Sequence, residues 1–429
     1  MQIWDKKYET MPTKELEQLQ LERLQTTLYR ILRNDVTFYR KRLDEIGFEL
    51  NDIESLSDIQ KLPFTTRQDL KNSYPYDMFA VPIREVVRIH EASGDMGIVG
   101  YTKNDVINWS NLVARMLYSA GITEDDKIQI TLPYGLFPGA FGYHYGAELI
   151  GASVIPTSTA NTEKQIMIME DYLTTVIILT PSYALRLIHD LKKLKKDFNR
   201  LQLKLAVLGA EPWNKSLRAE IEGGLKVTTC FNYGIASVFG PGVATECREK
   251  DGLHFFMDHF IAEIIHPSSG APLPMGEEGE LVITTITREA FPIIRFRTGD
   301  ITRLYFDKKP CPCGRTHPKI EPVKKRNDDL IVFRGINIYP DHIEKILTDI
   351  EGVKPKFRIV LNREDGEDEM SAEIEISENV FFDEMKIQKK FIENIENIFI
   401  RRLGAKIHVK LVEVNTIDSR EPLIIDNRK

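Results

Sequence analysis

The sequence predicts an α/β protein: a large N-terminal part built on mainly parallel sheets covered by helices, followed by a small mobile α+β domain. Short β-branched runs alternate with helical patterns from about residue 85 to 300, the pattern changes near Asp328, and 429 residues exceed a usual single domain. Strands that alternate with helices are typical of parallel sheets with both faces covered. We therefore predict an N-terminal domain over residues 1–327 and a C-terminal domain over 328–429.

The first expected element is a helix that begins near Thr13. The Thr13 hydroxyl can accept a hydrogen bond from a free backbone N–H of the first turn, so we expect it to cap the helix. Apolar residues then recur at near-helical spacing from Leu16 to Leu32, and we interpret this stripe as core packing.

The alternating region comes next. Its predicted strands cover residues 127–132, 152–156, 176–180 and 205–209, and its predicted helices cover 105–120, 161–172 and 182–194. Parallel sheets bind ligands beyond the carboxyl ends of their strands. The loops after Leu132, Pro156 and Leu208 are therefore where we expect a binding site.

The region after Asp328 predicts a small α+β unit of about a hundred residues, close to the common domain size. Its predicted strands cover residues 330–333, 356–361, 370–376 and 407–413, and its predicted helices cover 340–350 and 382–402. A polar, glycine-containing turn over 363–367 predicts a hairpin between the second and third strands.

Composition restricts the classes of function. Apolar residues make up 42% and charged residues 28% of the chain, which is typical of a globular protein with a large core. The net charge of -7 gives no broad electrostatic reason to expect nucleic acid or anionic membrane as a partner. The sequence lacks an apolar run of membrane-spanning length and an N-terminal signal core, so we expect a cytoplasmic protein. It does not fix the oligomeric state, and a homodimer is compatible with it.

The cysteines indicate a metal site. Cys311, Cys313 and His317 lie in one tight loop, and Cys247 and His254 lie close together upstream. Sets of four thiolate and imidazole ligands suit tetrahedral zinc, and a site closed by four protein ligands is structural because catalytic zinc needs an open position. We predict Cys247, His254, Cys311 and Cys313 as the ligands of a structural Zn²⁺, with His317 as the competing fourth ligand.

Several short motifs occur in a fixed order. They cover residues 209–213, 232–234, 240–244, 251–254, 276–282, 295–300, 311–315 and 334–340. In this order and spacing they resemble the phenylacetate-coenzyme A ligases, a branch of the adenylate-forming superfamily. The resemblance spans roughly residues 5 to 415; each motif alone is weak, whereas the ordered set is specific.

The resemblance implies a two-step reaction. A carboxylic acid attacks the α-phosphate of ATP, with Mg²⁺ as cofactor, and gives an acyl-adenylate and pyrophosphate. The thiol of coenzyme A then displaces AMP and forms a thioester. It also implies that the small C-terminal domain rotates between the two steps about a hinge at Asp328 and Asp329, where a few residues absorb the backbone change.

The resemblance also assigns the nucleotide site. It implies that Tyr233 stacks on adenine, that Asp300 accepts hydrogen bonds from the ribose hydroxyls, and that Arg326 faces ribose or phosphate. The other nucleotide-binding residues that it implies are Ser93, Gly94, Gly97, Gly209, Ala210, Glu211, Pro212, Asn232 and Gly234. Gly335 would border the pantetheine tunnel of coenzyme A, where a side chain would block the thiol.

An aromatic loop could form the pocket for the acid. Tyr134, Phe137 and Phe141 lie within the segment 134–142, just after a predicted strand, and would wall a flat apolar pocket. The alternative interpretation of these aromatic residues is ordinary core packing, and the sequence favours neither.

Three positions depart from the family pattern, and all concern the ATP chemistry. The phosphate loop lacks both family threonines and carries Asp95, and like charges a few ångströms apart repel by roughly 1 to 4 kcal/mol. Ser237 stands where the family has a glutamate that helps to hold Mg²⁺. Arg420 aligns on or near the catalytic lysine and keeps its charge in a planar fork.

These observations leave two functional hypotheses. The first hypothesis is that the chain is an acid-coenzyme A ligase that acts on an arylacetate such as phenylacetate, with Arg420 in the catalytic position. The alternative is an adenylation-impaired relative that binds adenine nucleotide or coenzyme A without full ligase turnover. The three departures favour the alternative, but the motif order and the retained nucleotide-site residues are the stronger signal, so we predict the ligase.

Overall fold

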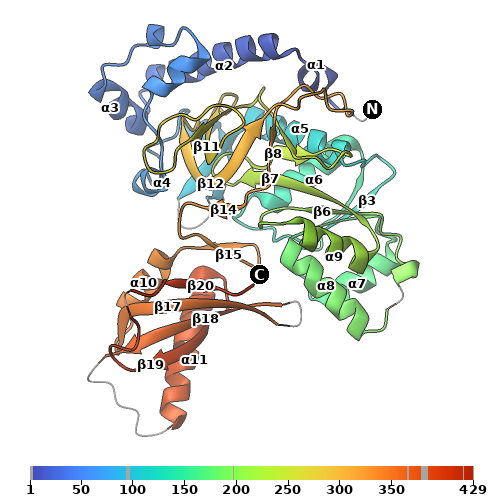
Figure 1. Ribbon diagram of the computed structural model, residues 1–429, viewed down its shortest axis with the longest axis vertical. Coiled ribbons are helices and arrows are strands. Elements are labelled where there is room, and N and C mark those ends of the chain that lie inside the picture. Colours follow the sequence, from blue (N-terminus) through green and yellow to red (C-terminus); the bar gives the residue numbers. More distant parts are fainter. Residues whose placement is uncertain are drawn as a thin grey trace. The chain divides into compact units, whose positions relative to one another are not determined.

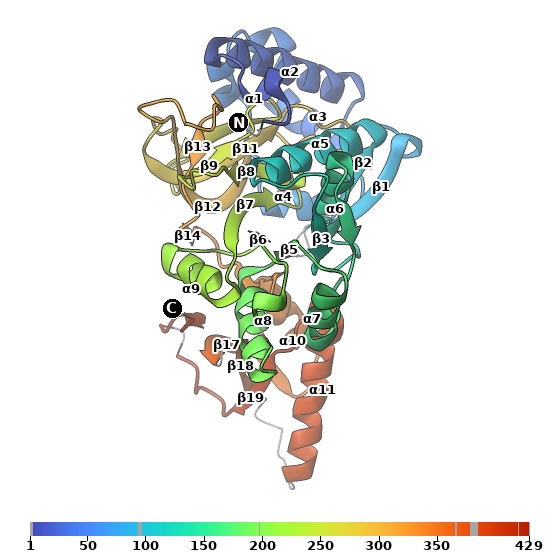
Figure 2. The same cartoon turned by 90° about the vertical axis from the view of Figure 1, so that its right-hand side faces the viewer.

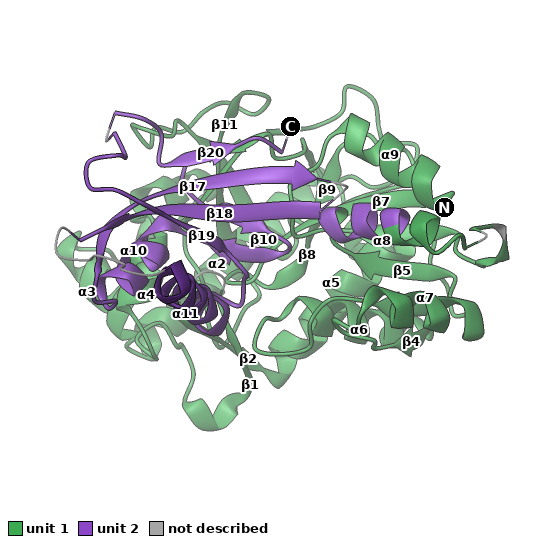
Figure 3. Ribbon diagram, turned by 90° about the horizontal axis from the view of Figure 1, so that it is seen from below, with its two compact units in different colours: residues 1–181, 190–327 green, residues 182–189, 328–429 purple. Residues whose placement is uncertain are grey.

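Helices and strands are shown from two sides in Figures 1 and 2, which depict a computed structural model. The structure describes residues 3–92, 97–196, 198–364, 367–377, 385–418 and 420–428. Its contacts divide the chain into one unit of residues 1–181 and 190–327 and a second of residues 182–189 and 328–429 (Figure 3). The first unit contains a large mixed sheet with helices and the second a four-stranded sheet with helices, so the predicted fold class is confirmed.

Helices dominate the N-terminal segment of the first unit. They are α1 (Lys6–Glu9), α2 (Thr13–Arg33), α3 (Thr37–Glu45) and α4 (Arg67–Asn72), with the 3₁₀ turns η1 (Leu50–Asp52), η2 (Leu56–Lys61) and η3 (Ile83–Glu85). The expected cap at Thr13 is wrong. Thr13 is the first helical residue, because the carbonyl of Pro12 already accepts the first helical hydrogen bond, from the Leu16 N–H at 2.9 Å.

The predicted parallel sheet forms one half of the large sheet. Its strands are β3 (Lys127–Ile130), β4 (Ser153–Ile155), β5 (Val176–Leu179), β6 (Leu205–Leu208) and β7 (Thr228–Ile235), in the order β4-β3-β5-β6-β7 with every pair parallel. The helices that alternate with them are α5 (Lys103–Ser119), α6 (Gly139–Ile150), α7 (Thr162–Asp171), α8 (Pro181–Lys193) and α9 (Lys215–Leu225), and the turn η4 (Phe198–Arg200) precedes β6. The strands and helices that the sequence predicts here are confirmed.

The other half of the large sheet is antiparallel. From β7 it continues through β8 (Gly240–Glu246), β9 (Leu253–Phe255), β13 (Lys319–Ile320), β12 (Phe296–Tyr305), β11 (Glu278–Thr285) and β10 (Phe260–Ile265), and β14 (Lys325–Arg326) pairs with β12. No helix occurs between α9 and residue 340, a stretch that the structure describes throughout. Without crossover helices no parallel connection forms, and every neighbouring pair in this half is antiparallel. The parallel character that we predicted is thus confined to β3–β7.

A separate antiparallel ribbon, β1 (Val86–Glu91) and β2 (Ile98–Thr102), precedes α5. Its inner face carries Arg88 and His90, whereas Val87 and Ile89 are exposed. The ribbon thus turns its polar side chains inward, which is the reverse of the usual pattern.

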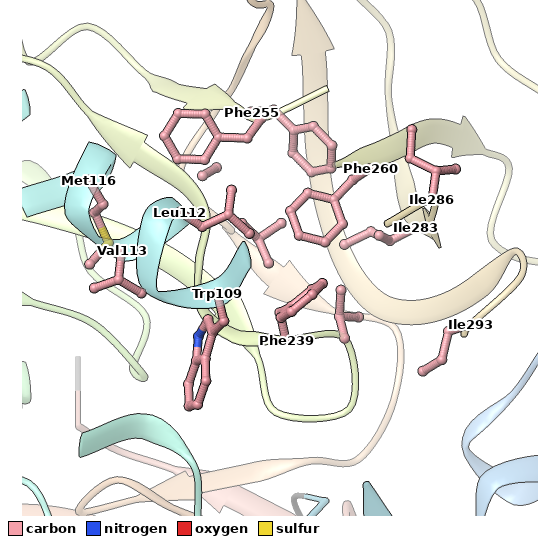
Figure 4. Packing of buried hydrophobic residues seen from close by; sticks show 14 of the residues in the cluster. Trp109, Leu112, Val113, Met116, Phe239, Phe255, Phe260, Ile283, Ile286 and Ile293 are labelled. Carbon is pink, nitrogen blue, oxygen red and sulfur yellow. The ribbon is translucent and has the colours of Figure 1, made fainter. Parts of the chain in front are cut away.

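The main core lies between α5 and the antiparallel strands. Trp109, Leu112 and Val113 of α5 are fully buried, and Figure 4 shows Leu112 on the side of the helix toward Phe260 and Val113 beside Met116. Helix α5 also packs against α6 and β8, as Figure 2 shows. Apolar side chains spaced three or four residues apart on α5 therefore make it the helix around which the first unit packs.

The second unit has its own core. Its elements are β15 (Ile331–Phe333), β16 (Ile336–Ile338), α10 (Pro340–Thr348), β17 (Val353–Glu364), β18 (Glu367–Ile376), α11 (Met385–Leu403), β19 (His408–Val412) and β20 (Ile424–Asp426). The four-stranded sheet has the order β19-β18-β17-β20, and the apolar faces of α10 and α11 are buried with it. The predicted elements form, but the structure adds β16 and β20, two strands of three residues that are too short to show a period. Asp365 and Gly366 of the predicted hairpin turn lie outside the described residues.

Among the helices formed by the described residues, none combines the length and the apolar character that crossing a lipid bilayer requires.

Candidate active site

The loop over residues 209–212 follows β6 at the carboxyl edge of the parallel strands, where the sequence predicts a site. Asn232 of the neighbouring strand β7 supports the base of this loop. Its Nδ2 donates to the Leu208 carbonyl at 2.9 Å, and its Oδ1 accepts from the Tyr143 hydroxyl at 3.0 Å. Ala210 has a φ of 67°, so the chain turns sharply here. The structure thus brings the predicted loop and Asn232 together and adds Tyr143, which no motif indicated.

Tyr233, Asp300 and Arg326 form one hydrogen-bonded group. The Tyr233 hydroxyl donates to Asp300 Oδ2 at 2.6 Å, and Arg326 Nη1 donates to Asp300 Oδ1. Arg326 Nη2 also donates to the Thr298 carbonyl at 2.7 Å. The short strand β14 places Arg326 directly opposite Asp300 on β12, so strand register creates the ion pair.

The electrostatics of this group keep the Tyr233 phenol protonated. Burial, and then the negative charge of Asp300, raise the pKa of Tyr233 well above its ordinary value. The phenol therefore stays protonated and donates to the carboxylate. Hydrogen bonds to an ionised carboxylate are stronger than neutral ones, so the group holds the Tyr233 ring in a fixed direction.

Gly234 allows β7 and β8 to approach closely. A Cβ at this position would lie 2.1 Å from the carbonyl oxygen of Gly240 on β8. Any side chain would force the two strands apart and move Tyr233 with them.

The predicted phosphate loop is described only at its end. Ser93, Gly94 and Asp95 lie outside the described residues. Gly97 has a φ of 85°, a conformation that favours glycine, and its carbonyl accepts from the Ala92 N–H at 2.9 Å.

Ser237, at the family's magnesium-glutamate position, is completely buried. Its hydroxyl Oγ has no hydrogen-bond partner among the described residues, and its backbone carbonyl accepts from Arg288 Nη1 at 2.8 Å. Arg288 is also fully buried and stacks over Tyr101 at 4.6 Å from the ring centroid. This position therefore combines a neutral hydroxyl and a nearby cation, the opposite of what a divalent metal ion needs.

Phe141 is the centre of an aromatic group at the proposed acid pocket. Its ring lies 5.3 Å from that of Tyr134, edge to face, and 6.3 Å from that of Tyr145. No ring contact joins Phe137 to Tyr134 or Phe141, both of which belong to the described part of the chain. His144 Nδ1 lies 3.1 Å from the Tyr134 hydroxyl, a neighbour that the sequence did not indicate.

The four predicted metal ligands form one cluster. The candidate ligand atoms of Cys247, His254, Cys311 and Cys313 all lie within 4.8 Å of one another. The Sγ atoms of Cys247 and Cys311 are 3.8 Å apart, and Cys313 Sγ lies 3.4 Å from His254 Nε2. Hydrogen bonding from Cys247, helped by His254, lowers the pKa of Cys313 and favours its thiolate. The donor set of three sulfurs and one imidazole nitrogen matches structural zinc sites.

His317 lies outside this cluster. Its Nε2 lies 2.9 Å from the Tyr8 carbonyl, and its Nδ1 accepts from the Met257 N–H at 3.0 Å, so both ring nitrogens are engaged. Its own backbone carbonyl lies 3.2 Å from His254 Nδ1. If His254 Nδ1 donates to this carbonyl, the lone pair of Nε2 is available to the thiol side of the cluster. Metal-binding histidines are commonly oriented by such a hydrogen bond to a backbone carbonyl.

The remaining predicted residues lie in the second unit. Asp328 Oδ2 accepts from the Tyr339 hydroxyl at 3.4 Å, and Asp329 follows it before β15. Arg334 and Gly335 form the two-residue turn between β15 and β16, with φ angles of 51° and 77°. Positive φ at both positions is typical of a type I′ hairpin, which explains the glycine.

Arg420, the predicted catalytic residue, is highly exposed in the second unit. Its Nη2 donates to Asp418 Oδ2 at 2.7 Å, and the side chain is 90% exposed. The guanidinium is therefore at the surface, paired with a carboxylate two residues away.

Comparisons with known proteins identify related families for both units of the chain. The family model described as AMP-binding enzyme matches residues 100–287, and the one described as AMP-binding enzyme C-terminal domain matches residues 335–428. A phenylacetate-coenzyme A ligase of Escherichia coli is 44% identical over 376 residues, covering 86% of this chain and 85% of the relative. The corresponding ligase of Thermus thermophilus is 41% identical over 383 residues, covering 88% and 85%.

A solved structure is similar along the whole chain. The crystal structure of 2-hydroxyisobutyryl-CoA ligase in complex with 2-HIB-AMP and CoA, in the thioesterification state, has a TM-score of 0.93 and 27% sequence identity. The match covers 100% of this chain and 93% of that structure.

Proposed function

We propose, since this chain belongs to the phenylacetate-coenzyme A ligase family, that its substrate is phenylacetate or a closely related arylacetic acid. The chain is an ATP-dependent, AMP-forming acid-coenzyme A ligase, which makes an acyl-adenylate and then an acyl-coenzyme A thioester. The observation that carries this proposal is identity with phenylacetate-coenzyme A ligases along most of the chain. The same observation favours the ligase over an adenylation-impaired relative.

The nucleotide site is proposed at the carboxyl edge of β6 and β7. Tyr233 would offer its ring to adenine, because its hydroxyl is tied to Asp300 and its ring direction is fixed. Asp300 would accept hydrogen bonds from the ribose hydroxyls. An ionised carboxylate has about four lone-pair sites, so sites remain after Tyr233 and Arg326 have each donated to one of its oxygens. Loop 209–212 and Asn232 would form the wall beside the purine, and Gly97 would end the loop that approaches the phosphates.

The second unit is proposed to complete both half-reactions. Arg420 would contact the carboxylate and the α-phosphate during adenylation, since its planar fork can bind two oxygens at once. Asp328 and Asp329 would be the hinge, and the side-chain-free Gly335 would leave space for the pantetheine thiol. Catalysis would then come from positioning and from stabilisation of charge on the α-phosphate.

Mg²⁺ is proposed to enter with ATP. Adenylate-forming ligases use this ion, which neutralises charge on the phosphate oxygens. The neutral, buried hydroxyl of Ser237 does not provide the carboxylate that a hard cation prefers. We therefore propose that the phosphate oxygens of ATP, and not Ser237, bind Mg²⁺.

A structural Zn²⁺ is proposed at Cys247, His254, Cys311 and Cys313. The support is the clustering of four suitable ligand atoms and the backbone carbonyl that orients His254. Such an ion would tie the loop around Cys311 to β8 and β9 without taking part in the reaction. The four cysteines, all of which the structure describes, form no disulfide, which fits a reducing compartment such as the cytoplasm.

The test of the proposed function is acid-dependent exchange of radiolabelled pyrophosphate into ATP. Pure full-length protein with Mg²⁺-ATP should catalyse exchange with phenylacetate and should give none without acid or with short-chain acids such as acetate. Exchange with acetate but not phenylacetate would contradict the proposed substrate class. No exchange with any acid, while calorimetry detects AMP binding, would contradict ligase activity and support the binding-only alternative.

A further inference from the structure

Two neighbouring side chains of β1 have buried polar atoms without a hydrogen-bond partner. Among the described residues, neither Nη1 of Arg88 nor Nε2 of His90 has one. The two residues lie on the same, inward face of the strand, because side chains two apart on a strand point the same way. Buried polar atoms are nearly always hydrogen-bonded, so two such atoms on the same face of one strand indicate a group that the protein itself does not supply.

Both atoms belong to the aromatic group around Phe141. The Arg88 guanidinium lies 5.4 Å from the Phe141 ring centroid and 4.6 Å from that of Tyr145, and its Nη2 donates to the Tyr145 hydroxyl at 2.8 Å. The His90 ring lies 5.4 Å from that of Phe141 on another side. An apolar ring, a donor and an acceptor therefore meet at the proposed acid pocket.

The hydrogen bonds define which atom donates and which accepts. His90 Nδ1 lies 2.9 Å from the Leu136 carbonyl, which can only accept, so Nδ1 carries the proton. In the neutral ring, Nε2 is then an acceptor. Burial lowers the pKa of His90, and the nearby positive charges of Arg88 and Arg288 act in the same direction, so the ring stays neutral. Arg88 Nη1 can only donate, because a guanidinium group carries N–H donors and no acceptor.

We propose that the acid activated by this chain carries a hydroxyl group on its aromatic part, which donates to His90 Nε2 and accepts from Arg88 Nη1. A hydroxyl group is both donor and acceptor and so satisfies both atoms. A second carboxylate would suit Arg88 but would leave the lone pair of His90 facing negative charge. An unsubstituted phenyl ring would leave both atoms unpaired. The inference rests on the proposed function and narrows its substrate to ring-hydroxylated arylacetic acids.

The test uses binding, so that it does not depend on turnover. The probes are non-hydrolysable acyl-adenylate analogues, 5′-O-(N-acylsulfamoyl)adenosines, made from phenylacetate and from its three ring-hydroxylated isomers. Calorimetry with the full-length protein should show one hydroxylated isomer binding at least about tenfold more tightly than the phenylacetyl compound, because a site built for a hydroxyl discriminates strongly against its absence.

Two variants of His90 test whether this residue causes the preference for a hydroxylated isomer. His90→Asn can keep the donor to the Leu136 carbonyl but has no atom at the Nε2 position, so the ratio between the affinities for the preferred hydroxylated isomer and for the phenylacetyl compound should fall to about twofold or less. His90→Gln reaches the Nε2 position and should keep part of the preference. Thermal melting checks that both variants fold.

The outcomes separate this inference from the proposed function. If the protein binds the phenylacetyl compound and every hydroxylated isomer equally, the hydroxyl inference is overturned and the proposed function stands. A preference that survives in His90→Asn overturns the assignment to His90. If the protein binds none of the four compounds, the proposed function fails, and the inference fails with it.

Discussion

Tyr233 and Asp300 depend on each other. The carboxylate fixes the direction of the phenol ring, and the phenol together with Arg326 orients the carboxylate that we assign to the ribose. A change at either residue should therefore alter nucleotide binding through both, although by different amounts.

Asp300→Asn should weaken AMP binding strongly. The amide keeps the size of the carboxylate but removes its charge, so the partly buried guanidinium of Arg326 loses its carboxylate partner. We expect a loss of about 1.5 to 3 kcal/mol, roughly 10- to 150-fold in affinity. Tyr233→Phe keeps the ring and loses only one hydrogen bond, so about tenfold or less is expected. Calorimetry measures both. Unchanged AMP affinity in Asp300→Asn would show that the nucleotide binds elsewhere.

Ser237 stands where the family resemblance leads us to expect a glutamate that helps to hold Mg²⁺. Ser237→Glu combined with Asp95→Thr should raise the rate of pyrophosphate exchange by about tenfold or more, since it restores a metal-binding carboxylate and removes a negative charge from the phosphate loop. Ser237→Gln with Asp95→Thr is the matched control, because it has the same bulk without the charge. Equal rates in the two double variants would mean that magnesium is held without help from this position.

Among single residues, the sequence predicted those that lie in motifs. It did not indicate residues whose contacts join segments that are far apart in the sequence. Tyr233 and Asp300 were found because each lies in a recognisable segment. Tyr143 and Arg88 lie in no such segment, and their roles arise from packing against β7 and α6. Only the folded arrangement of elements brings such partners together.

Among the elements, the loop 311–317 is the link between the cysteine cluster and the N-terminal helix α1. Arg315 Nε donates to Glu9 Oε2 at 2.6 Å, and both side chains are almost completely buried. The Thr316 N–H donates to the Glu9 carbonyl at 3.1 Å. If the cysteine loop became disordered, Arg315 would move away and the buried Glu9 carboxylate would lose its partner. An uncompensated buried charge is strongly destabilising, so the N-terminal segment should detach as well.

Cys311→Ser should therefore lower both zinc content and stability. We expect elemental analysis to give about one zinc per chain in the unmodified protein and almost none in the variant, with a stability loss of about 3 kcal/mol or more. Cys230→Ser is the control, since Cys230 is buried but lies outside the cluster. Unmodified protein that contains no zinc would refute the metal assignment.

The elements also show where sequence patterns suffice. Strands β3, β5 and β6 were predicted because buried β-branched runs alternate with helices. The antiparallel half was not predicted as such. Its strands β8 and β11 are buried along nearly their whole length, so they lack the alternation of apolar and polar residues that identifies antiparallel strands.

At the scale of the whole molecule, the order of the motifs carries more information than any one of them. Eight short segments in a fixed order are sufficient to identify the family from the sequence alone. The grouping of contacts in the structure changes between Asn327 and Asp328. Rotation of the second unit about Asp328 and Asp329 stays a prediction.

The central claim is that this chain joins an arylacetic acid to coenzyme A at the expense of ATP. The most direct test is to incubate the full-length protein with Mg²⁺-ATP, coenzyme A and phenylacetate or its hydroxylated isomers, and to quantify AMP and acyl-coenzyme A by mass spectrometry. We predict that both products form in equal amounts and only when acid is present. Absence of thioester with every acid, at enzyme concentrations comparable to the substrates, would contradict the claim.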